Sequence, residues 1–165
     1  MCKTTANPVH LVKASSDDVA AISTMIKALH EHESVSMRED ARCAAIADLI
    51  SKPEQGRILL IKNDEGQLTG YVILAFGFSI EFGGRDAYID ELFVIESCRG
   101  RGVGSSALEA VCGWASDYGL CALHLEVERD NETAKALYLR NGFEDRQRYH
   151  LMSLQIADVG KKRLT

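Results

Sequence analysis

Residues 98–105 read Cys98-Arg99-Gly100-Arg101-Gly102-Val103-Gly104-Ser105, and this stretch decides the fold. A branched apolar segment precedes it and a helical repeat of apolar residues follows it, which predicts a strand-to-helix junction. The N–H groups of a first helical turn have no partner inside the helix, and the helix dipole favours negative charge there. Glycines let the main chain approach an anion closely. The stretch therefore predicts a pyrophosphate site, with two arginines adding positive charge.

Other interpretations of these glycines stay open from the residues alone. They are equally compatible with a plain turn. A dinucleotide fingerprint needs glycine where Ser105 stands, although Glu126 or Glu128 could supply its ribose-binding acid. That fold also needs more than one βαβ unit. A Walker A loop needs Gly-Lys-Ser/Thr at its end, and this ending is absent here.

The junction belongs to one predicted βαβ unit. A strand at Ala87–Ile95 leads into the turn, a helix at 103–118 follows, and a strand at 121–128 alternates apolar and polar residues. Gly119 suits the end of the helix. Such a unit is expected to be parallel and right-handed. Asn131 is then expected to cap another helix that ends near Gly142.

The rest of the chain predicts further strands and two earlier helices. The links between the strands are too short for crossovers, so antiparallel pairing is expected. Ser15 with Asp18 forms a capping box before the first helix, and Ser36 with Glu39 repeats that signal before a second helix that runs to Ile50. The remaining predicted strands are Val9–Val12, Arg57–Lys62, Leu68–Ile80 and Arg148–Leu154.

Length and composition bound the function. A chain of 165 residues with 46% hydrophobic residues predicts a single domain with a real core. The net charge of −5 argues against a general nucleic-acid binder, because phosphate neutralisation needs a basic face. Five scattered cysteines without a CxxC pair predict reduced thiols in a cytoplasmic protein rather than a zinc site. No signal peptide and no membrane span are expected.

A resemblance adds to this interpretation. Arg99-x-x-Gly102-x-Gly104, after the strand Glu91–Ile95, resembles the motif with which the GNAT superfamily holds the pyrophosphate of coenzyme A. The segment Asn131-Glu132-Thr133-Ala134-Lys135-Ala136-Leu137-Tyr138-Leu139-Arg140-Asn141-Gly142-Phe143 resembles its second signature. The two together, in this order, are much more specific than either alone. The resemblance covers nearly the whole chain.

The resemblance implies an α/β (α+β) GNAT fold in a single domain, 1–165. Its central mixed, mostly antiparallel sheet would have six to seven strands, with about four helices and one parallel βαβ unit. It implies an N-acetyltransferase that uses acetyl-CoA, without a metal. A homodimer is expected, because many relatives pair through their C-terminal strands. The residues implied to hold acetyl-CoA are Leu92, Phe93, Val94, Arg99, Gly100, Arg101, Gly102, Val103, Gly104, Ser105, Asn131, Ala134 and Tyr138.

A closer likeness is to the spermidine/spermine N-acetyltransferase branch. Residues 88–94, Tyr-Ile-Asp-Glu-Leu-Phe-Val, and residues 26–33, Ile-Lys-Ala-Leu-His-Glu-His-Glu, are similar to two of its segments. This implies that Glu33, Asp90 and Glu91 bind a small cationic polyamine or diamine. This chain departs from the branch in two ways: the order of the two adjacent acids is reversed, and the first helix carries histidines. Aminoglycoside or protein amines, and a non-catalytic acyl-CoA-binding module, are the alternatives.

Acetyl transfer sets the roles of the catalytic candidates. An alkylamine has a pKa of about 10.4, so only about one molecule in a thousand is nucleophilic at neutral pH. Glu91 is the candidate base, through water, and backbone N–H groups near Phe93 and Val94 could hold the thioester oxygen if the strand ladder has a gap. Tyr138 is the candidate acid for the thiolate. Solvated acids and a core-packed tyrosine are the plainer alternatives.

Two details of these candidates depend on geometry. Adjacent strand residues point to opposite faces, so Asp90 and Glu91 share a cavity only if a bulge intervenes. His30 and His32 suggest a metal site at first sight, but residues two apart do not share a helix face. They are interpreted as part of a solvated helix end, and no metal is expected.

Overall fold

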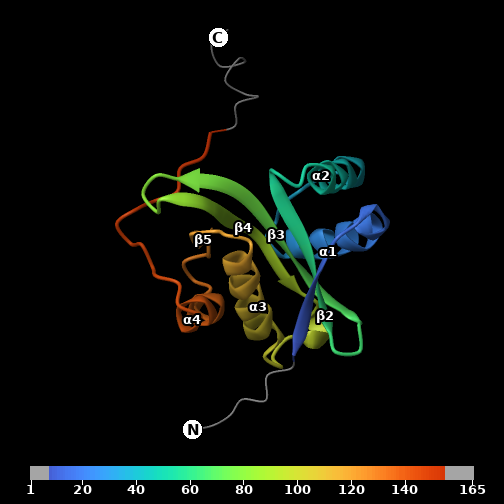
Figure 1. Cartoon of the computed structure of the whole chain (residues 1–165). Helices are drawn as coiled ribbons and strands as arrows, with labels where there is room; N and C mark the ends of the chain where they lie inside the picture. Colours follow the sequence, from blue (N-terminus) through green and yellow to red (C-terminus); the bar gives the residue numbers. More distant parts are fainter. Residues whose placement is uncertain (1–7, 155–165) are drawn as a thin grey trace.

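The computed structural model describes residues 8–154, which form one five-stranded sheet in the order β1-β2-β3-β4-β5 (Figure 1). The first four strands pair antiparallel, and β5 pairs parallel to β4. In chain order the α3 helix follows β4 and precedes β5, which gives the predicted βαβ unit. The strands are β1 (Val9–Lys13), β2 (Gly56–Asn63), β3 (Leu68–Ser79), β4 (Gly84–Val94) and β5 (Ala122–Leu125).

Helices cover both faces of this sheet (Figure 1). One face carries α1 (Val19–His32) and α2 (Glu39–Ser51), and the other carries α3 (Val103–Asp117) and α4 (Glu132–Arg140). The face of α3 that packs on the sheet carries the apolar residues whose helical repeat predicted this helix. Its buried residues are Val103, Ala107, Leu108, Val111 and Ala115.

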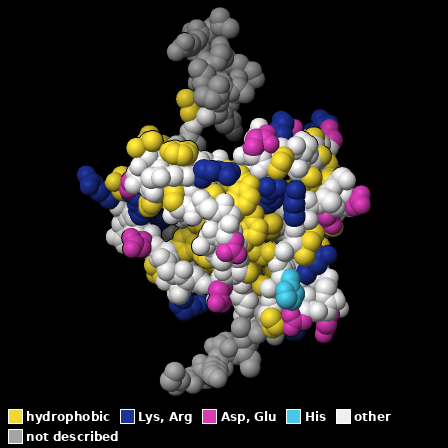
Figure 2. All heavy atoms as spheres, in the orientation of Figure 1, with side chains coloured by type: hydrophobic (Ala, Val, Ile, Leu, Met, Phe, Trp, Pro, Cys, Tyr) yellow, Lys and Arg dark blue, Asp and Glu magenta, His cyan; other side chains and the backbone are white. Residues whose placement is uncertain are grey.

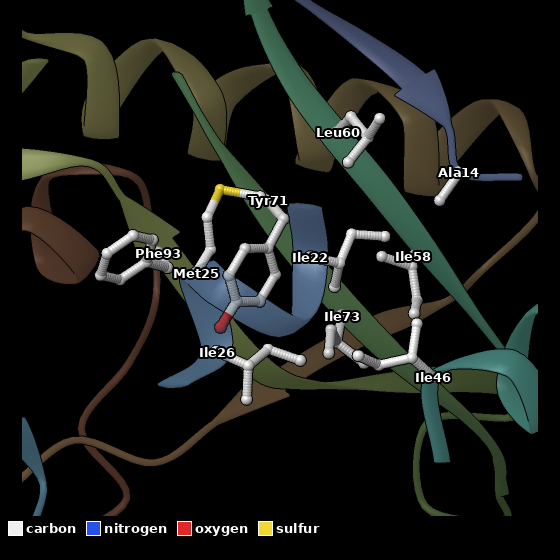
Figure 3. Close-up of a cluster of buried hydrophobic side chains, with 10 residues drawn as sticks. All are labelled: Ala14, Ile22, Met25, Ile26, Ile46, Ile58, Leu60, Tyr71, Ile73 and Phe93. Carbon is white, nitrogen blue, oxygen red and sulfur yellow. The ribbon is translucent and has the colours of Figure 1, made fainter. Parts of the chain in front are cut away.

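The core beneath α1 and α2 is built around a completely buried tyrosine. Figure 3 shows Tyr71 of β3 between Met25 and Ile26 of α1, with Phe93 of β4 beside it. The rings of Tyr71 and Phe93 stack with centroids 5.8 Å apart. Fully burying one such aliphatic or aromatic side chain contributes about 1.5–3 kcal/mol. The tyrosine hydroxyl therefore sits in an apolar layer, where it needs a hydrogen-bond partner.

The predicted helix signals are confirmed with one exception. The backbone N–H of Ser15 donates to the Asp18 carboxylate at 2.8 Å, in the capping box of a short 3₁₀ helix, η1 (Ser16–Asp18), that leads into α1. The Asn131 side chain accepts from the N–H of Ala134 at 3.0 Å. The prediction that Ser36 caps α2 is wrong, because Arg38 occupies the capping position and no side chain caps that helix.

The expected strand count of six to seven is also wrong, because the predicted strand at Arg148–Leu154 is absent from the five-stranded sheet. Arg146, just before this segment, contacts the turn between β3 and β4 instead. The guanidinium of Arg146 lies 4.6 Å from the ring centre of Tyr149 and pairs with Glu81 at 2.7 Å. Alternating apolar residues form a strand only when a neighbouring strand supplies the ladder, and these side-chain contacts do not.

Three further observations concern the described residues. The described cysteines, Cys43, Cys98, Cys112 and Cys121, are all free thiols, and Cys2 lies outside the described part. Within residues 8–154, no group of histidines, cysteines and acids is arranged to hold a metal ion. No helix in that range is long and apolar enough to cross a membrane.

Gly70 offers a test of how closely β3 and β4 are packed. A Cβ at Gly70 would lie 2.1 Å from the carbonyl oxygen of Phe93, so the backbone must shift to admit it. Gly70→Ala is expected to lower the free energy of unfolding by roughly 1–3 kcal/mol in urea denaturation. Gly113→Ala is the matched control, because an added Cβ on this exposed α3 residue meets nothing within 4 Å. It should be neutral or stabilise by about 0.5–1 kcal/mol. Equal stability of the two variants would contradict the close packing.

Candidate active site

A bulge in β4 brings the two adjacent acids into one pocket. Ile73 of β3 pairs with Glu91, whereas the next residue, Leu74, pairs with Ile89, so Asp90 is the extra residue without a partner in β3. The bulge breaks the alternation of side chains along the strand. Asp90 and Glu91 consequently both line a cavity of about 220 Å³ between α1, α2 and the sheet. The condition set by the sequence for a shared cavity is met.

The Glu91 carboxylate is held by one hydrogen bond to each oxygen. His30 Nε2 lies 2.9 Å from Oε1, and the Tyr71 hydroxyl donates to Oε2 at 2.7 Å. The side chains of Glu91 and His30 are only 16% and 15% exposed. Because a carboxylate accepts hydrogen bonds, Nε2 must carry the hydrogen, and the buried Nδ1 of His30 has no partner among the described residues. Glu91 is thus fixed in position before any substrate binds.

This geometry corrects the sequence interpretation of the histidines. His32 is exposed, but His30 is enclosed and bonded to Glu91, so it is not part of a solvated helix end. Tyr71 was missed altogether as a site residue. Its only signal in the sequence was a hydroxyl-bearing ring within an apolar strand. Tyr71 and His30 lie 20 and 61 residues before Glu91 in the chain.

Negative charge dominates the electrostatics of this region. Burial, and then the charges of Glu91 and Glu126, raise the pKa of Asp90 above its ordinary value. Burial and the charge of Glu91 raise the pKa of Tyr71 far above its ordinary value, so its phenol stays protonated and can donate. A cation placed beside Asp90 and Glu91 would relieve this repulsion.

Tyr138 lies on α4, on the face of the sheet opposite the acidic pocket. It is half-buried against the core under α3 and contacts the ring of Phe143, with the centroids 5.8 Å apart. Burial, and then the charge of Glu33, raise the pKa of Tyr138, which keeps the phenol protonated. Glu33 itself is exposed at the end of α1 and also raises the pKa of Tyr71. Its charge therefore acts on side chains from both faces of the sheet.

The glycine turn has the backbone expected of an anion site. Gly100 and Gly102 have φ angles of 72° and 84°, which favour glycine. The first hydrogen bond of α3 runs from the Ser106 N–H to the Gly102 carbonyl, so in the described chain the N–H groups of residues 103–105 donate to no backbone carbonyl. These unpaired donors at a helix N-terminus fit a pyrophosphate.

The two motifs meet beside this turn. The Asn141 side chain at the end of α4 donates to the Ser105 hydroxyl at 3.5 Å and to the Leu137 carbonyl at 2.8 Å. A Cβ on Gly104 would lie 3.6 Å from the Leu137 side chain, an ordinary packing distance, so α4 lies directly beside the first turn of α3. The structure thus brings together the turn and the helix that carries Tyr138.

The arginines of the turn are arranged differently from one another. Arg101 is exposed, as expected for a residue that meets an anion from solvent. Arg99 is also exposed, but its Nε donates to the Val94 carbonyl at 2.7 Å and its guanidinium lies 5.2 Å from the ring centre of Phe93. It therefore lies along β4 in this structure rather than over the glycines.

The β4 edge next to these groups is open. Pairing with β5 ends at Ile89 and Leu125, so within the described residues positions 91–94 pair only with β3, and Asp90 pairs with neither strand. Leu92, Phe93 and Val94 have no strand beside them on the β5 side. This opening is the ladder gap that the proposed oxygen site needs. Figure 2 shows hydrophobic side chains in the middle of this view, between the α1–α2 side and the α3–α4 side.

Comparisons with known proteins agree with this arrangement. A sequence model of the acetyltransferase (GNAT) family matches residues 23–143. The chain is 28% identical over 138 residues to the uncharacterized N-acetyltransferase YhfO of Bacillus subtilis (strain 168), covering 83% of this chain and 91% of that protein. It is also 28% identical over 154 residues to thialysine N-epsilon-acetyltransferase of Bos taurus, covering 83% and 85%.

A solved structure extends the comparison to three dimensions. The crystal structure of an integron cassette protein from the mobile metagenome of Cole Harbour Salt Marsh superposes with a TM-score of 0.76 and 30% identity. The match covers 88% of this chain and 90% of that one.

Gly102→Val tests the anion site. A valine at this φ is strained, and its side chain would stand where the phosphate oxygens approach the backbone. Affinity for acetyl-CoA in calorimetric titration should fall about tenfold or more. Gly119→Val is the control, because Gly119 has a nearly equal φ of 81° at the other end of α3. It should cost similar stability but leave acetyl-CoA affinity unchanged. Unchanged affinity in Gly102→Val would place the anion elsewhere.

Proposed function

This chain belongs to the acetyltransferase (GNAT) family, and we propose that it transfers the acetyl group of acetyl-CoA to a primary amine of a small molecule by direct attack in a ternary complex. The observation that carries the proposal is the bulge at Asp90. It places two carboxylates in one small pocket beside an open strand edge.

Acetyl-CoA supplies the activated acetyl group, and the turn between β4 and α3 supplies its pyrophosphate site. The uncommitted N–H groups of residues 103–105 would hold the phosphates, and the open edge of β4 at residues 92–94 would accept the chain that leads to the thioester. Backbone N–H groups on this edge are candidates to hold the thioester oxygen.

The acceptor enters as an ammonium ion and must lose a proton before its nitrogen can attack. The carboxylates of Asp90 and Glu91 would attract the ammonium group, and Glu91 would receive the proton through a water molecule. His30 and Tyr71 fill one position on each Glu91 oxygen, which keeps the carboxylate oriented while leaving further lone pairs for that water. As the C–S bond breaks, the protonated phenol of Tyr138 would donate to the leaving thiolate.

A diamine or polyamine is the acceptor class that the acids by themselves favour. One ammonium group would lie at Asp90 and Glu91, and another at Glu33, which is exposed at the end of α1. The bovine relative is named for acetylation of an ε-amine, which supports an aliphatic primary amine as the acceptor. The 220 Å³ cavity favours a small molecule over an aminoglycoside.

Tyr138→Phe tests the acid. If the phenol assists thiolate departure, kcat should fall by about 10²–10⁴-fold while acetyl-CoA affinity changes little. Tyr149→Phe removes an equivalent hydroxyl from an exposed tyrosine outside the site and should leave both values unchanged. Wild-type turnover in Tyr138→Phe would show that the hydroxyl has only a structural role.

The amine-binding role of Glu33 is tested together with the acceptor class. Coenzyme A release is measured for wild type against monoamines, diamines, an aminoglycoside and a lysine-containing peptide. For an accepted amine, Glu33→Gln should raise KM by a few-fold, since exposed charges contribute about 1 kcal/mol or less, and KM for acetyl-CoA should stay nearly constant. Added salt should shrink the difference.

Glu31→Gln is the control, because this exposed glutamate on the same helix pairs with Lys27 at 3.7 Å. Its amine KM should equal that of wild type. Equal amine KM values in wild type and Glu33→Gln, or a preference for acidic acceptors without an amine, would remove Glu33 from the acceptor site.

A further inference from the structure

Arg42 is a buried cation without an acidic partner. Its side chain is 6% exposed, and it extends from α2 toward α1. Its Nε donates to the Ser23 hydroxyl at 2.9 Å and one terminal nitrogen donates to the Met37 carbonyl at 3.2 Å. No carboxylate among the described residues lies within ion-pair distance of it. A buried charge held only by neutral groups is costly, so its presence calls for an explanation.

Arg42 lines the same cavity as the acids. Arg42 belongs to the α2 wall of this pocket, whereas Asp90 and Glu91 belong to β4. The wall between them is apolar and includes Ile46 and Ile58. The pocket therefore has a cationic group and an acidic pair on different elements, joined by a surface suited to methylene groups.

We infer that this pocket binds an acceptor that carries a carboxylate as well as the primary amine, that is, an ω-amino acid. This inference rests on the proposed function, since the amine must lie at Asp90 and Glu91. The carboxylate would accept hydrogen bonds from Arg42, and charge-assisted bonds of this kind are about twice as strong as neutral ones. The ligand would then match both the buried guanidinium and the acidic pair.

The size of the cavity sets the length of this acceptor. A water molecule occupies about 30 Å³ in the liquid, so 220 Å³ corresponds to a ligand of about seven or eight non-hydrogen atoms. An amino acid with a straight chain of about five carbons has this size. A diamine of the same length fits the volume, but its second ammonium group would face Arg42 and be repelled.

The competing explanation is that Arg42 only ties α2 to α1 and to the segment before α2. Its bonds to Ser23 and Met37 serve that purpose. A purely structural arginine would affect every acceptor equally, because it would change the amount or the shape of the folded enzyme. A carboxylate-binding arginine would discriminate between acceptors that differ only at the end far from the amine.

Three acceptors of equal chain length separate these explanations: δ-aminovalerate ends in a carboxylate, n-pentylamine in a methyl group, and cadaverine in a second amine. With wild-type enzyme and acetyl-CoA, kcat/KM should be highest for δ-aminovalerate, by about 10- to 100-fold over n-pentylamine, and lowest for cadaverine. Arg42→Met should abolish the preference for δ-aminovalerate, and Arg42→Lys should retain part of it. Arg38→Met, at an exposed arginine that pairs with Asp40, should leave it intact.

The ratio of the two kcat/KM values does not depend on the fraction of enzyme that is folded, so it stays interpretable if Arg42→Met is unstable. The wild-type comparison decides even if that variant does not fold. Equal values for δ-aminovalerate and n-pentylamine, cadaverine as the best acceptor, or an unchanged preference in Arg42→Met would each overturn the carboxylate site and leave amine acetylation standing. Acetylation of none of the amines tested, these three included, would overturn the proposed function and this inference with it.

Discussion

The extra residue in β4 is the constraint on which the rest of the site depends. Without the bulge at Asp90, the alternation of side chains would send Asp90 and Glu91 to opposite faces of the sheet. The same strand loses its β5 partner after Ile89, so the bulge and the open edge lie next to each other. The bulge is thus associated with an acidic pocket on the α1–α2 side and with an open edge of β4 after Ile89.

Two hydrogen bonds hold the Glu91 carboxylate in the pocket that the bulge forms. Its partners come from α1 and β3, so the carboxylate links α1 to the β3–β4 hairpin. A carboxylate held in this way need not reorganise when an amine arrives, which is the condition for effective proton transfer. Tyr71 can serve this purpose because the surrounding apolar layer keeps its phenol protonated.

The sequence predicted the parts of the molecule that are specified by contiguous residues. The glycine turn, α3 with Gly119 at its end, and α4 with its Asn131 cap all follow from local rules of backbone geometry and capping. The roles of His30 and Arg42 could not be predicted in this way. Each depends on a partner or a cavity wall brought near by the tertiary fold, and a histidine or arginine on a helix is most often solvated. The prediction of a last strand failed for a related reason, since a strand forms only where a neighbouring strand pairs with it.

This difference in predictability follows from how the two halves of the site are built. In the proposed function the donor half would use backbone N–H groups of one turn. Side chains that permit the turn would preserve it, so very different sequences could bind the same cofactor. The acceptor half is a pocket whose walls come from α1, α2, β2, β3 and β4, with its charges carried by single side chains. One substitution at a position such as Arg42 or Asp90 changes which ligand charge is stabilised, while the fold and the donor turn remain. The family can therefore be read from a few adjacent residues, whereas the acceptor must be argued from the charges that line the pocket.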